Sequence, residues 1–346
     1  MYIRQINPHG GDVFDRDVRW DFSSNINPRG MPQAVKDAIK RAAAHCEGYP
    51  DPYCRRLRAA LAVREGVAPD CILCSNGAAE LIYSFAFALP KDRPVLLVSP
   101  TFCEYQAALS AAGIAAEHDV LSEQNGFVLT ESFLKTDFHH YSAVILCTPN
   151  NPTGVTVAPD ILYRIAETGV RMLVDMCFLE LSDMAERYAL PRLLADCPNV
   201  TVLKAFTKSY AMAGVRLGYA MNTDGVFLER MARMTQCWNV SAIAQEAGIA
   251  ALDCEEWLRR SVTEITSERE RMTQALRSYG VKVFPSRANY LLLYTERDLY
   301  RLLSEHRILV RDCANYTGLR RGYYRVAVRT KDENDRLLAA IKEVMR

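Results

Sequence analysis

The chain has 346 residues, 49% of them hydrophobic, which is enough material for sizeable cores and suggests about two domains. Its 42 Lys and Arg nearly balance its 41 Asp and Glu, and the net charge of +1 excludes a basic field for nucleic acid and a polybasic membrane anchor. We therefore expect its partners to be small molecules or copies of itself.

The N-terminal segment lacks the apolar core of a signal peptide, and the longest apolar run, near Leu81 to Pro90, is too short to cross a bilayer. These features predict a cytoplasmic protein with no membrane partner. The eleven cysteines have no regular spacing and are expected to be free thiols. The CxxC at Cys71 to Cys74 is better explained as two strand residues than as a metal site, so no metal is predicted.

Short apolar runs alternate with helix-like stretches between about residues 70 and 220. The strand candidates are Cys71–Ser75, Pro94–Ser99, Ala143–Thr148, Arg171–Asp175, Val200–Ala205 and Arg216–Met221, with helices expected over 78–89 and 160–169. The alternation predicts an α/β fold with three α/β/α layers, in which helices cover both faces of a mostly parallel sheet.

The pattern changes after about residue 255. A charged helix is expected over 255–280 with Gly280 as its C-cap, followed by short strands over 281–284, 289–294, 308–310 and 323–328 and by helices over 298–306 and 331–345. This order predicts a smaller α+β domain. We predict a large domain over 36–250 and a small domain formed by 251–346 together with the N-terminal segment 1–35.

Five residues suited to binding or catalysis lie at or just after the ends of candidate strands, namely Gly77, Phe102, Asn151, Asp175 and Lys208. Ligands of an open parallel sheet collect at the carboxyl ends of its strands, so one pocket could hold all five. A lysine for an aldehyde, an acid for a ring nitrogen, an aromatic face and backbone N–H groups for a phosphate together indicate a pyridoxal phosphate site.

The phosphate of such a cofactor would lie at the strand-to-helix turn formed by Gly77, Ala78 and Ala79, where free N–H groups favour anions. Arg216 and Thr207 could add a guanidinium and a hydroxyl. Each residue alone has a simpler explanation. Asp175 fits a hydrogen-bonded strand end, Asn151 a turn, Phe102 a core position and Arg216 a surface cation. Their order and placement favour the shared site.

The motifs GAAE, SPTF, PNNPTG, Asp175 and TKSYAMAGVRLGY, in that order, resemble the fold type I, class I/II aminotransferases that depend on pyridoxal phosphate. The resemblance is strongest to the branch that contains histidinol-phosphate aminotransferase and threonine-phosphate decarboxylase. It implies that Lys208 binds the cofactor covalently and that Asp175 and Asn151 hold its pyridine ring. It also implies that Phe102, or else Tyr105, stacks on the ring.

By the same resemblance, Arg216, Thr207 and Gly77 to Ala79 hold the cofactor phosphate. Tyr49, in YPDPYCRRLR, would reach the phosphate site of a partner subunit, which implies a homodimer. Two departures from the family pattern stand out. Ala205 replaces a hydroxyl residue three positions before the lysine, and the Asp175 motif reads DMCF, with Met176 and with Phe178 in place of a tyrosine.

The reaction depends on how the substrate's anionic groups are held. The resemblance suggests Arg311, Arg325 and Asn151 as substrate ligands, and His9, Ser23, Ser24 and Asn25 as groups facing a substrate phosphate. Arg329 is interpreted as a surface charge, as are the loop histidines His139 and His140. A loop histidine with a local turn bond is an equal alternative for His9.

These features predict decarboxylation of O-phospho-L-threonine, a step of cobalamin side-chain synthesis. Transamination of histidinol phosphate or a related amino acid is the alternative. A third possibility, a regulatory protein that retains the fold, is disfavoured because the chain has neither an added basic helix-turn-helix nor a lost lysine.

Overall fold

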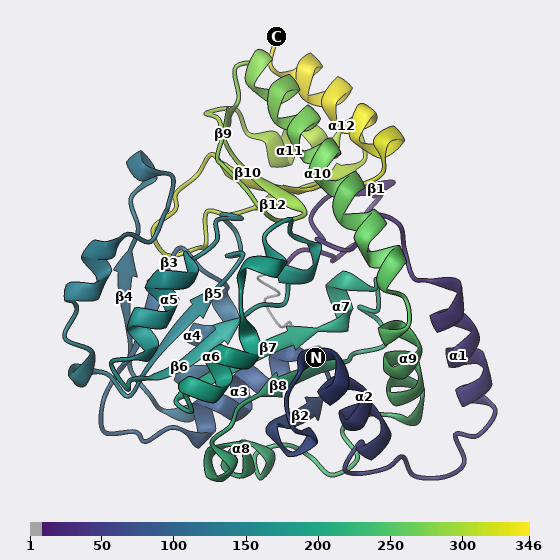
Figure 1. Cartoon of the computed structure of the whole chain (residues 1–346). Helices are drawn as coiled ribbons and strands as arrows, with labels where there is room; N and C mark the ends of the chain where they lie inside the picture. The colour runs from purple at the N-terminus through teal and green to yellow at the C-terminus, as the bar shows by residue number, and fades with distance from the viewer. Residues whose placement is uncertain (1–8) are drawn as a thin grey trace, which may run out of the picture.

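The structure of the protein is a computed structural model that describes residues 9–346. Its centre is a seven-stranded sheet (Figure 1). The strands are β2 (Ile72–Ser75), β3 (Val95–Ser99), β4 (Ala116–Val120), β5 (Ala143–Cys147), β6 (Arg171–Asp175), β7 (Val200–Ala205) and β8 (Gly218–Met221). They lie in the order β2-β8-β7-β6-β5-β3-β4, and β8 alone in this sheet runs opposite to its neighbours. The predicted α/β fold is confirmed.

Helices cover both faces of this sheet, and each face has its own core. One face packs against α3 (Ala78–Ala88), α4 (Cys103–Ala112) and α8 (Gly225–Ala232). The other packs against α2 (Arg55–Glu65), α5 (Pro159–Ala166), α6 (Leu190–Asp196) and α9 (Ala242–Leu252), with α1 (Gln33–Ala43) lying along α9 (Figure 1). Strands β3 and β5 are buried along their whole length, which explains why they read as continuous apolar runs.

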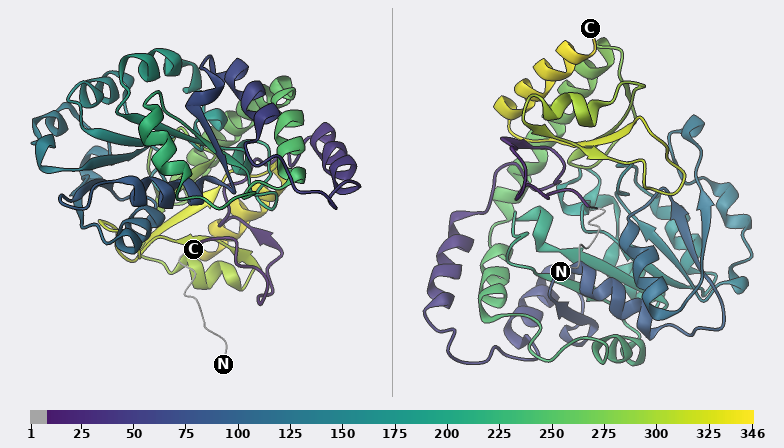
Figure 2. Two further views of the ribbon diagram at one scale, coloured as in Figure 1. Left: turned by 90° about the horizontal axis from the view of Figure 1, so that it is seen from below. Right: turned by 180° about the vertical axis from the view of Figure 1, so that it is seen from behind.

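A second, four-stranded antiparallel sheet lies beside the first, toward the C-terminal end of the chain (Figures 1 and 2). It contains β9 (Lys282–Val283), β10 (Tyr290–Tyr294), β12 (Arg311–Asp312) and β13 (Tyr323–Ala327), and α10 (Glu255–Ser278), α11 (Leu299–Ser304) and α12 (Lys331–Val344) cover it. Tyr279 closes α10, and Gly280 follows it with a positive φ of 82°. The proposed division of the chain at residues 36 and 250 stays a prediction.

The N-terminal segment joins the C-terminal part of the chain. Strand β1 (Trp20–Asp21) pairs in parallel with β11 (Ile308–Leu309), and the backbone of Phe22 bonds to Leu309 and Ala327. Figure 2 shows this segment passing beneath the C-terminal helices. These bonds place the next three residues, Ser23, Ser24 and Asn25, between the small sheet and the large sheet.

The topology places the predicted site residues at one edge of the large sheet. The carboxyl ends of β2, β3, β5, β6 and β7 share that edge, and the antiparallel β8 begins there, because Gly218 lies opposite both Ser75 and Ala205.

Four predicted strands of this sheet differ from the observed ones at one end. The predicted ends Cys71, Pro94 and Thr148 each lie one residue outside β2, β3 and β5, so Cys71 is not a strand residue. The largest difference is at β8. The strand begins at Gly218 rather than Arg216, because Arg216 has a left-handed backbone, φ 62°, that no strand accommodates.

All eleven cysteines are free thiols, as expected, and Cys74 lies in β2. Within residues 9–346, none of the helices combines the length and the apolar character needed to span a membrane.

Candidate active site

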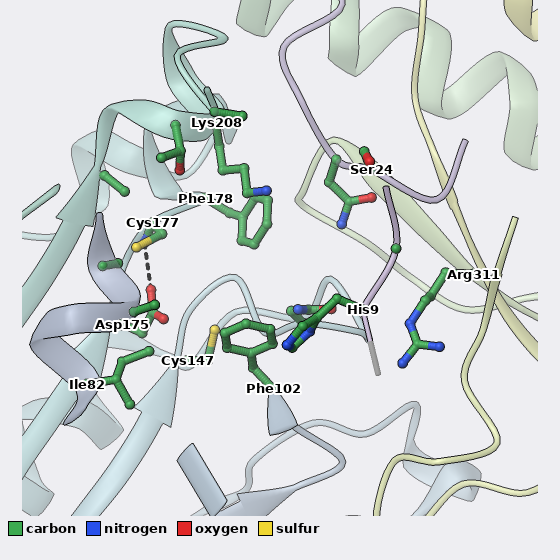
Figure 3. A pocket seen from close by; sticks show the side chains of 18 of the residues that line it. His9, Ser24, Ile82, Phe102, Cys147, Asp175, Cys177, Phe178, Lys208 and Arg311 are labelled. Carbon is green, nitrogen blue, oxygen red and sulfur yellow. Dashed lines mark hydrogen bonds between the residues drawn. The ribbon is translucent and has the colours of Figure 1, made fainter. Parts of the chain in front are cut away.

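A cavity opens where the strand ends of the large sheet face the small sheet and the N-terminal segment (Figure 3). Fourteen of the residues predicted from the sequence line it: His9, Ser23, Ser24, Asn25, Ala78, Ala79, Phe102, Asn151, Asp175, Thr207, Lys208, Arg216, Arg311 and Arg325. Gly77 lies just behind the wall, and Tyr49 lies elsewhere. The structure therefore brings the residues together, while the roles assigned to them stay predictions.

Asp175 ends β6 and is almost completely buried. The Tyr105 hydroxyl donates to its Oδ2 at 2.7 Å, and the backbone N–H of Cys177 donates to its Oδ1 at 2.9 Å. These two donors fix the orientation of the carboxylate. Phe102 packs edge-on against Tyr105, with ring centroids 5.7 Å apart, so Phe102 faces the cavity while Tyr105 holds Asp175.

Lys208 lies on the one-turn helix α7 (Phe206–Ser209), directly after β7. Its amine points into the cavity, 5.8 Å from the centre of the Phe178 ring (Figure 3). Burial, together with the positive charge of Arg325, lowers the pKa of this amine from 10.5 to about 8. A substantial fraction of the amine is therefore unprotonated near neutral pH and can act as a nucleophile.

Two glycines shape the place where an anion would lie. A Cβ added to Gly77 would stand 2.5 Å from Arg216 Nη2, and one added to Gly218 would stand 2.7 Å from the backbone nitrogen of Ala78. The guanidinium therefore packs directly on the turn that starts α3. No side chain caps that helix, so its first N–H groups and its dipole face the same place as Arg216.

The opposite wall is strongly basic. Arg311 and Arg325 are direct partners across β12 and β13, so their side chains leave the small sheet on the same face, and both line the cavity. Like charges in this position repel unless an anion lies between or beside them. Arg325 is buried, donates to Asn151 Oδ1 and donates to the Ser23 carbonyl at 2.7 Å, yet it forms no ion pair with a carboxylate of the described chain.

The side chain of Asn25 completes the shell around Arg325. With its amide turned so that the oxygen faces the guanidinium, it accepts from Nε at 3.1 Å and from Nη1 at 3.3 Å. A buried cation surrounded by neutral acceptors is suited to an anionic ligand, since only an opposite charge offsets the cost of removing it from water.

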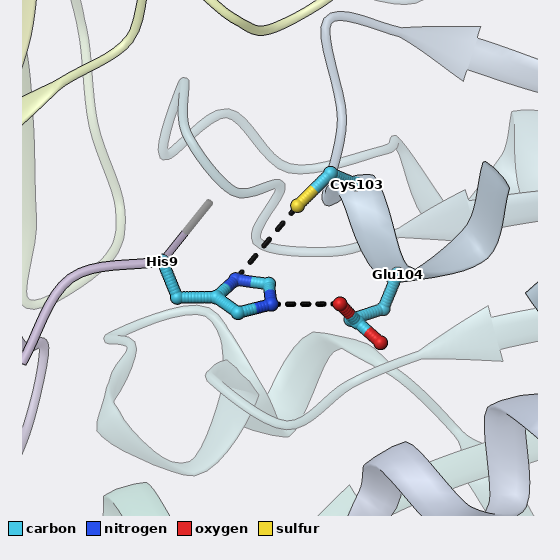
Figure 4. Close-up of side chains that lie close together, drawn as sticks. All are labelled: His9, Cys103 and Glu104. Atoms are coloured by element: carbon cyan, nitrogen blue, oxygen red, sulfur yellow. Dashed lines mark hydrogen bonds and ion pairs between the residues drawn. The ribbon is translucent and has the colours of Figure 1, made fainter. Parts of the chain in front are cut away.

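His9 lies between two residues at the start of α4 (Figure 4). Its Nε2 is 2.7 Å from Glu104 Oε1 and its Nδ1 is 3.7 Å from Cys103 Sγ. Cys103 and Glu104 raise the pKa of His9 to about 9, against the effect of burial. One ligand atom from each of His9, Cys103 and Glu104 lies within 4.8 Å of the other two. Within residues 9–346, these three side chains form the one group that could hold a metal ion. A hydrogen-bonded ion pair accounts for their arrangement.

Other predicted residues lie outside the cavity. Tyr49 is 82% exposed and stacks on Trp238, with centroids 4.6 Å apart. Arg329 pairs with Glu333 at 2.8 Å and does not line the cavity. His139 and His140 lie in an exposed turn.

Several lining residues were not predicted, among them Ile82, Cys147, Cys177 and Tyr316. Cys147 ends β5, but the predicted strand ran one residue further, to Thr148, so the rule that found Asp175 did not single out Cys147. Tyr316 belongs to RDCANYTGL, a stretch in which the arginine drew attention instead. Nothing in the sequence marks Ile82 apart from other helix residues.

The residues present fit pyridoxal phosphate. A carboxylate for the ring nitrogen, a buried amine, an aromatic face and an uncapped helix start beside a guanidinium occupy one cavity. The glycine cradle leaves room for a phosphate where any side chain would collide with Arg216. Ala205 lines this part of the cavity without offering a hydroxyl.

Comparisons with known proteins agree. Residues 19–341 match the family described as aminotransferase class I and II. The chain is 38% identical to threonine-phosphate decarboxylase of Salmonella typhimurium, over 97% of this chain and 96% of that protein. Its fold matches histidinol-phosphate aminotransferase from Clostridium acetobutylicum with a TM-score of 0.88, at 25% identity over 94% of this chain and 99% of the other.

A further match is histidinol-phosphate aminotransferase from Sinorhizobium meliloti in complex with pyridoxal 5'-phosphate, with a TM-score of 0.82 at 23% identity, covering 95% of this chain and 91% of the other. At that identity the match bears on the fold alone. The family match spans most of the chain and includes both walls of the cavity. The protein therefore belongs to the class I and II aminotransferase family of pyridoxal phosphate-dependent enzymes.

Proposed function

We propose that the protein is a threonine-phosphate decarboxylase, which converts O-phospho-L-threonine into (R)-1-aminopropan-2-yl phosphate and CO2. The observation that carries the proposal is the pair of arginines, Arg311 and Arg325, that are cross-strand partners on one wall of the cavity. O-phospho-L-threonine has two anionic groups, a carboxylate and a phosphate, whereas histidinol phosphate has only the phosphate. The 38% identity to a threonine-phosphate decarboxylase supports the same choice.

Arg325 and Asn151 suit the carboxylate, because Arg325 is buried and a planar guanidinium matches a planar carboxylate. Arg311 is only half-buried and lies, with Ser24 and His9, on the side of the cavity away from Asp175 (Figure 3). We assign Arg311, Ser24 and His9 to the phosphate. His9 already contacts Glu104 and Cys103, so it would have to share or exchange these contacts to donate to a phosphate.

Bound pyridoxal phosphate supplies an electron sink for the pair left behind when a bond to the substrate's α-carbon breaks. Asp175 would keep the ring nitrogen protonated and so preserve that sink. Arg325 and Asn151 would fix the direction of the carboxylate, and that direction would decide whether the bond to the carboxylate is the one that breaks. The carboxylate leaves as CO2, and a proton takes its place on the α-carbon.

Lys208 is suited to deliver that proton. Its Nζ lies in the cavity, and a pKa of about 8 lets it gain and lose a proton near neutral pH. Phe178 lies beside it and cannot donate, since it lacks the hydroxyl of a tyrosine. Lys208 is therefore the group we expect to hold the proton.

We also propose that the enzyme works as a cytoplasmic homodimer. Tyr49 and Trp238 form an exposed aromatic pair that does not reach the cavity of its own chain. Exposed aromatic pairs of this kind are typical of interfaces. Tyr49 would then serve the phosphate site of the second subunit. The amino alcohol phosphate produced would be a precursor of the cobalamin side chain.

The alternative is an aminotransferase acting on histidinol phosphate. The fold match to the Clostridium acetobutylicum enzyme favours it, and Lys208 would then move a proton between two carbons instead of replacing CO2. The residues that would hold the cofactor, among them Lys208, Asp175 and Arg216, suit both reactions.

One assay separates the two. The holoenzyme is given O-phospho-L-threonine, and CO2 release is followed beside glutamate formation from 2-oxoglutarate. We expect CO2 release that needs no 2-oxoglutarate. Steady transamination of histidinol phosphate with no CO2 from O-phospho-L-threonine would refute the decarboxylase assignment.

A further inference from the structure

Asn151 lies where the large and small sheets meet, and its side chain has two possible amide orientations. The loop that carries it is held firmly, because the neighbouring Asn150 donates to the Pro100 carbonyl at 2.8 Å and accepts from Thr101 Oγ1 at 2.8 Å. The remaining freedom is the rotation of the Asn151 amide. Which of its ends faces the cavity decides whether it can donate or accept there.

Two side chains from the C-terminal part of the chain, Arg325 and Tyr316, donate hydrogen bonds to the same atom of Asn151. Arg325 Nη1 donates to Oδ1, and the Tyr316 hydroxyl donates to Oδ1 at 3.4 Å. A carbonyl oxygen has two lone pairs, so these donors use both. The Nδ2 group is then the end of the amide that is left to donate into the cavity.

Tyr316 is well placed to keep this arrangement. It is almost completely buried, it packs with Phe127, Phe284 and Tyr323, and its ring lies 5.3 Å from the Arg311 guanidinium. The ring of Tyr316 therefore contacts Arg311, while its hydroxyl reaches Asn151, the hydrogen-bond partner of Arg325. Burial raises the pKa of the Tyr316 hydroxyl to about 12, which keeps it protonated and able to donate.

We infer that Tyr316 is a positioning residue that fixes the amide of Asn151 with its nitrogen toward the cofactor. The inference rests on the proposed cofactor site, in which Asn151 would hold the pyridine ring by donating one Nδ2 hydrogen to the ring oxygen of bound pyridoxal phosphate. It does not depend on which amino acid is the substrate. The hydrogen bond of 3.4 Å is long for two oxygens and is expected to shorten when the cavity is filled.

Tyr316→Phe removes the hydroxyl and keeps the ring beside Arg311. An N–H group that donates to the ring oxygen favours the deprotonated form of the bound chromophore. Loss of the hydrogen bond from Tyr316 to Asn151 should therefore raise the pH midpoint of the holoenzyme's visible absorption change by roughly 0.5 to 1 unit. Turnover should fall about 3- to 10-fold, with little change in KM, because both arginines remain.

Tyr188→Phe is the matched control. It also removes a buried hydroxyl, one that contacts Thr148 Oγ1 at 3.0 Å and the Val157 carbonyl at 2.5 Å, and it lies outside the cavity. It should leave the pH midpoint unchanged. A thermal melt of each variant checks that any shift is not caused by partial unfolding.

The decisive comparison repeats the Tyr316→Phe measurement in a protein that already carries Asn151→Ala. If Tyr316 acts through Asn151, Tyr316→Phe adds no further shift once the amide is gone. An equal shift in both backgrounds, or no shift in the wild-type background, would overturn the inference. A shift that depends on Asn151, in a protein that does not decarboxylate O-phospho-L-threonine, would support the positioning role and reject only the proposed reaction.

Discussion

Lys204 and Lys208 lie four residues apart and are both withdrawn from solvent, yet their surroundings suit them to different tasks. Lys204 Nζ contacts both carboxylate oxygens of Glu65, at 2.8 and 2.9 Å. Although burial opposes it, the charges of Glu180 and Glu65 hold the pKa of Lys204 above its ordinary value. Burial, with the charges of Arg325 and Arg216, lowers the pKa of Lys208 instead. The motifs predicted Lys208 as the reactive lysine, and the packing shows how the surroundings of the two amines differ.

Ala205 offers a test of the phosphate site by a single added atom. It is buried and lines the cavity beside Thr207. Ala205→Ser adds a hydroxyl that can donate to the cofactor phosphate, and one hydrogen bond should raise cofactor affinity by about 3- to 10-fold. Fluorescence titration of the apoenzyme with pyridoxal phosphate measures this. Unchanged or weaker binding would mean that the phosphate does not lie next to residue 205.

His9 predicts a pH-dependent stability. Its pKa in the folded state, about 9, exceeds the ordinary 6.5, so its contribution is complete below pH 6.5 and is lost as pH rises through about 9. For a partly exposed pair we expect roughly 1 kcal/mol or less. Melting curves of wild type and His9→Gln should differ most near pH 6 and converge above about pH 9. A difference that grows with pH would contradict the ion pair with Glu104.

At the scale of elements, the site depends on how closely α3, β8 and Arg216 approach one another. Gly77→Ala places a Cβ against Arg216 at a positive φ of 83°, and Gly113→Ala has a similar φ of 72° with open space around it. Gly113 is in the αL region, where alanine carries strain of about 1 kcal/mol. Gly77 has a ψ of 162° and lies in a region nearly restricted to glycine, so its strain is larger, about 1 to 3 kcal/mol. Only Gly77→Ala should weaken cofactor binding, by about 10-fold or more. Equal cofactor affinity in the two variants would disprove the cradle.

The sequence predicts elements where local pattern and environment agree. Strands β6 and β7 were predicted with their observed bounds. RMLVD is an apolar run bounded by Arg171 and Asp175, and VTVLKA is rich in β-branched and apolar residues. Strand β4 was missed because AEHDV is mostly polar, which suits an exposed edge. Strands β1 and β12 have two residues each, too few for a period.

At the scale of the whole molecule, the sequence could not predict contacts that link distant segments. The order of the motifs placed Asp175, Lys208 and Arg216 at one sheet edge. The Tyr105 hydroxyl on Asp175, the Glu104 carboxylate beside His9 and the Tyr316 hydroxyl on Asn151 depend on tertiary packing across 70, 95 and 165 residues. No local pattern marks such partners.

A shared site predicts complementation between subunits. If Tyr49 serves the second subunit, a mixed dimer of Tyr49→Ala and Lys208→Ala chains has one site with both defects and one intact site. Random mixing should then restore about a quarter of the wild-type activity, since half of the dimers are mixed. The two homodimers are the controls. No recovery from mixtures that do exchange subunits would place Tyr49 outside the partner's site.

The covalent role of Lys208 can be measured directly. Borohydride treatment of the purified holoenzyme fixes the link between cofactor and lysine, and peptide mass analysis then locates it. We predict one cofactor per chain, attached to Lys208 in the labelled peptide. Lys204, which contacts Glu65, should stay unmodified. A label on Lys204 or another lysine, or a protein that binds pyridoxal phosphate and takes up no label, would contradict the account.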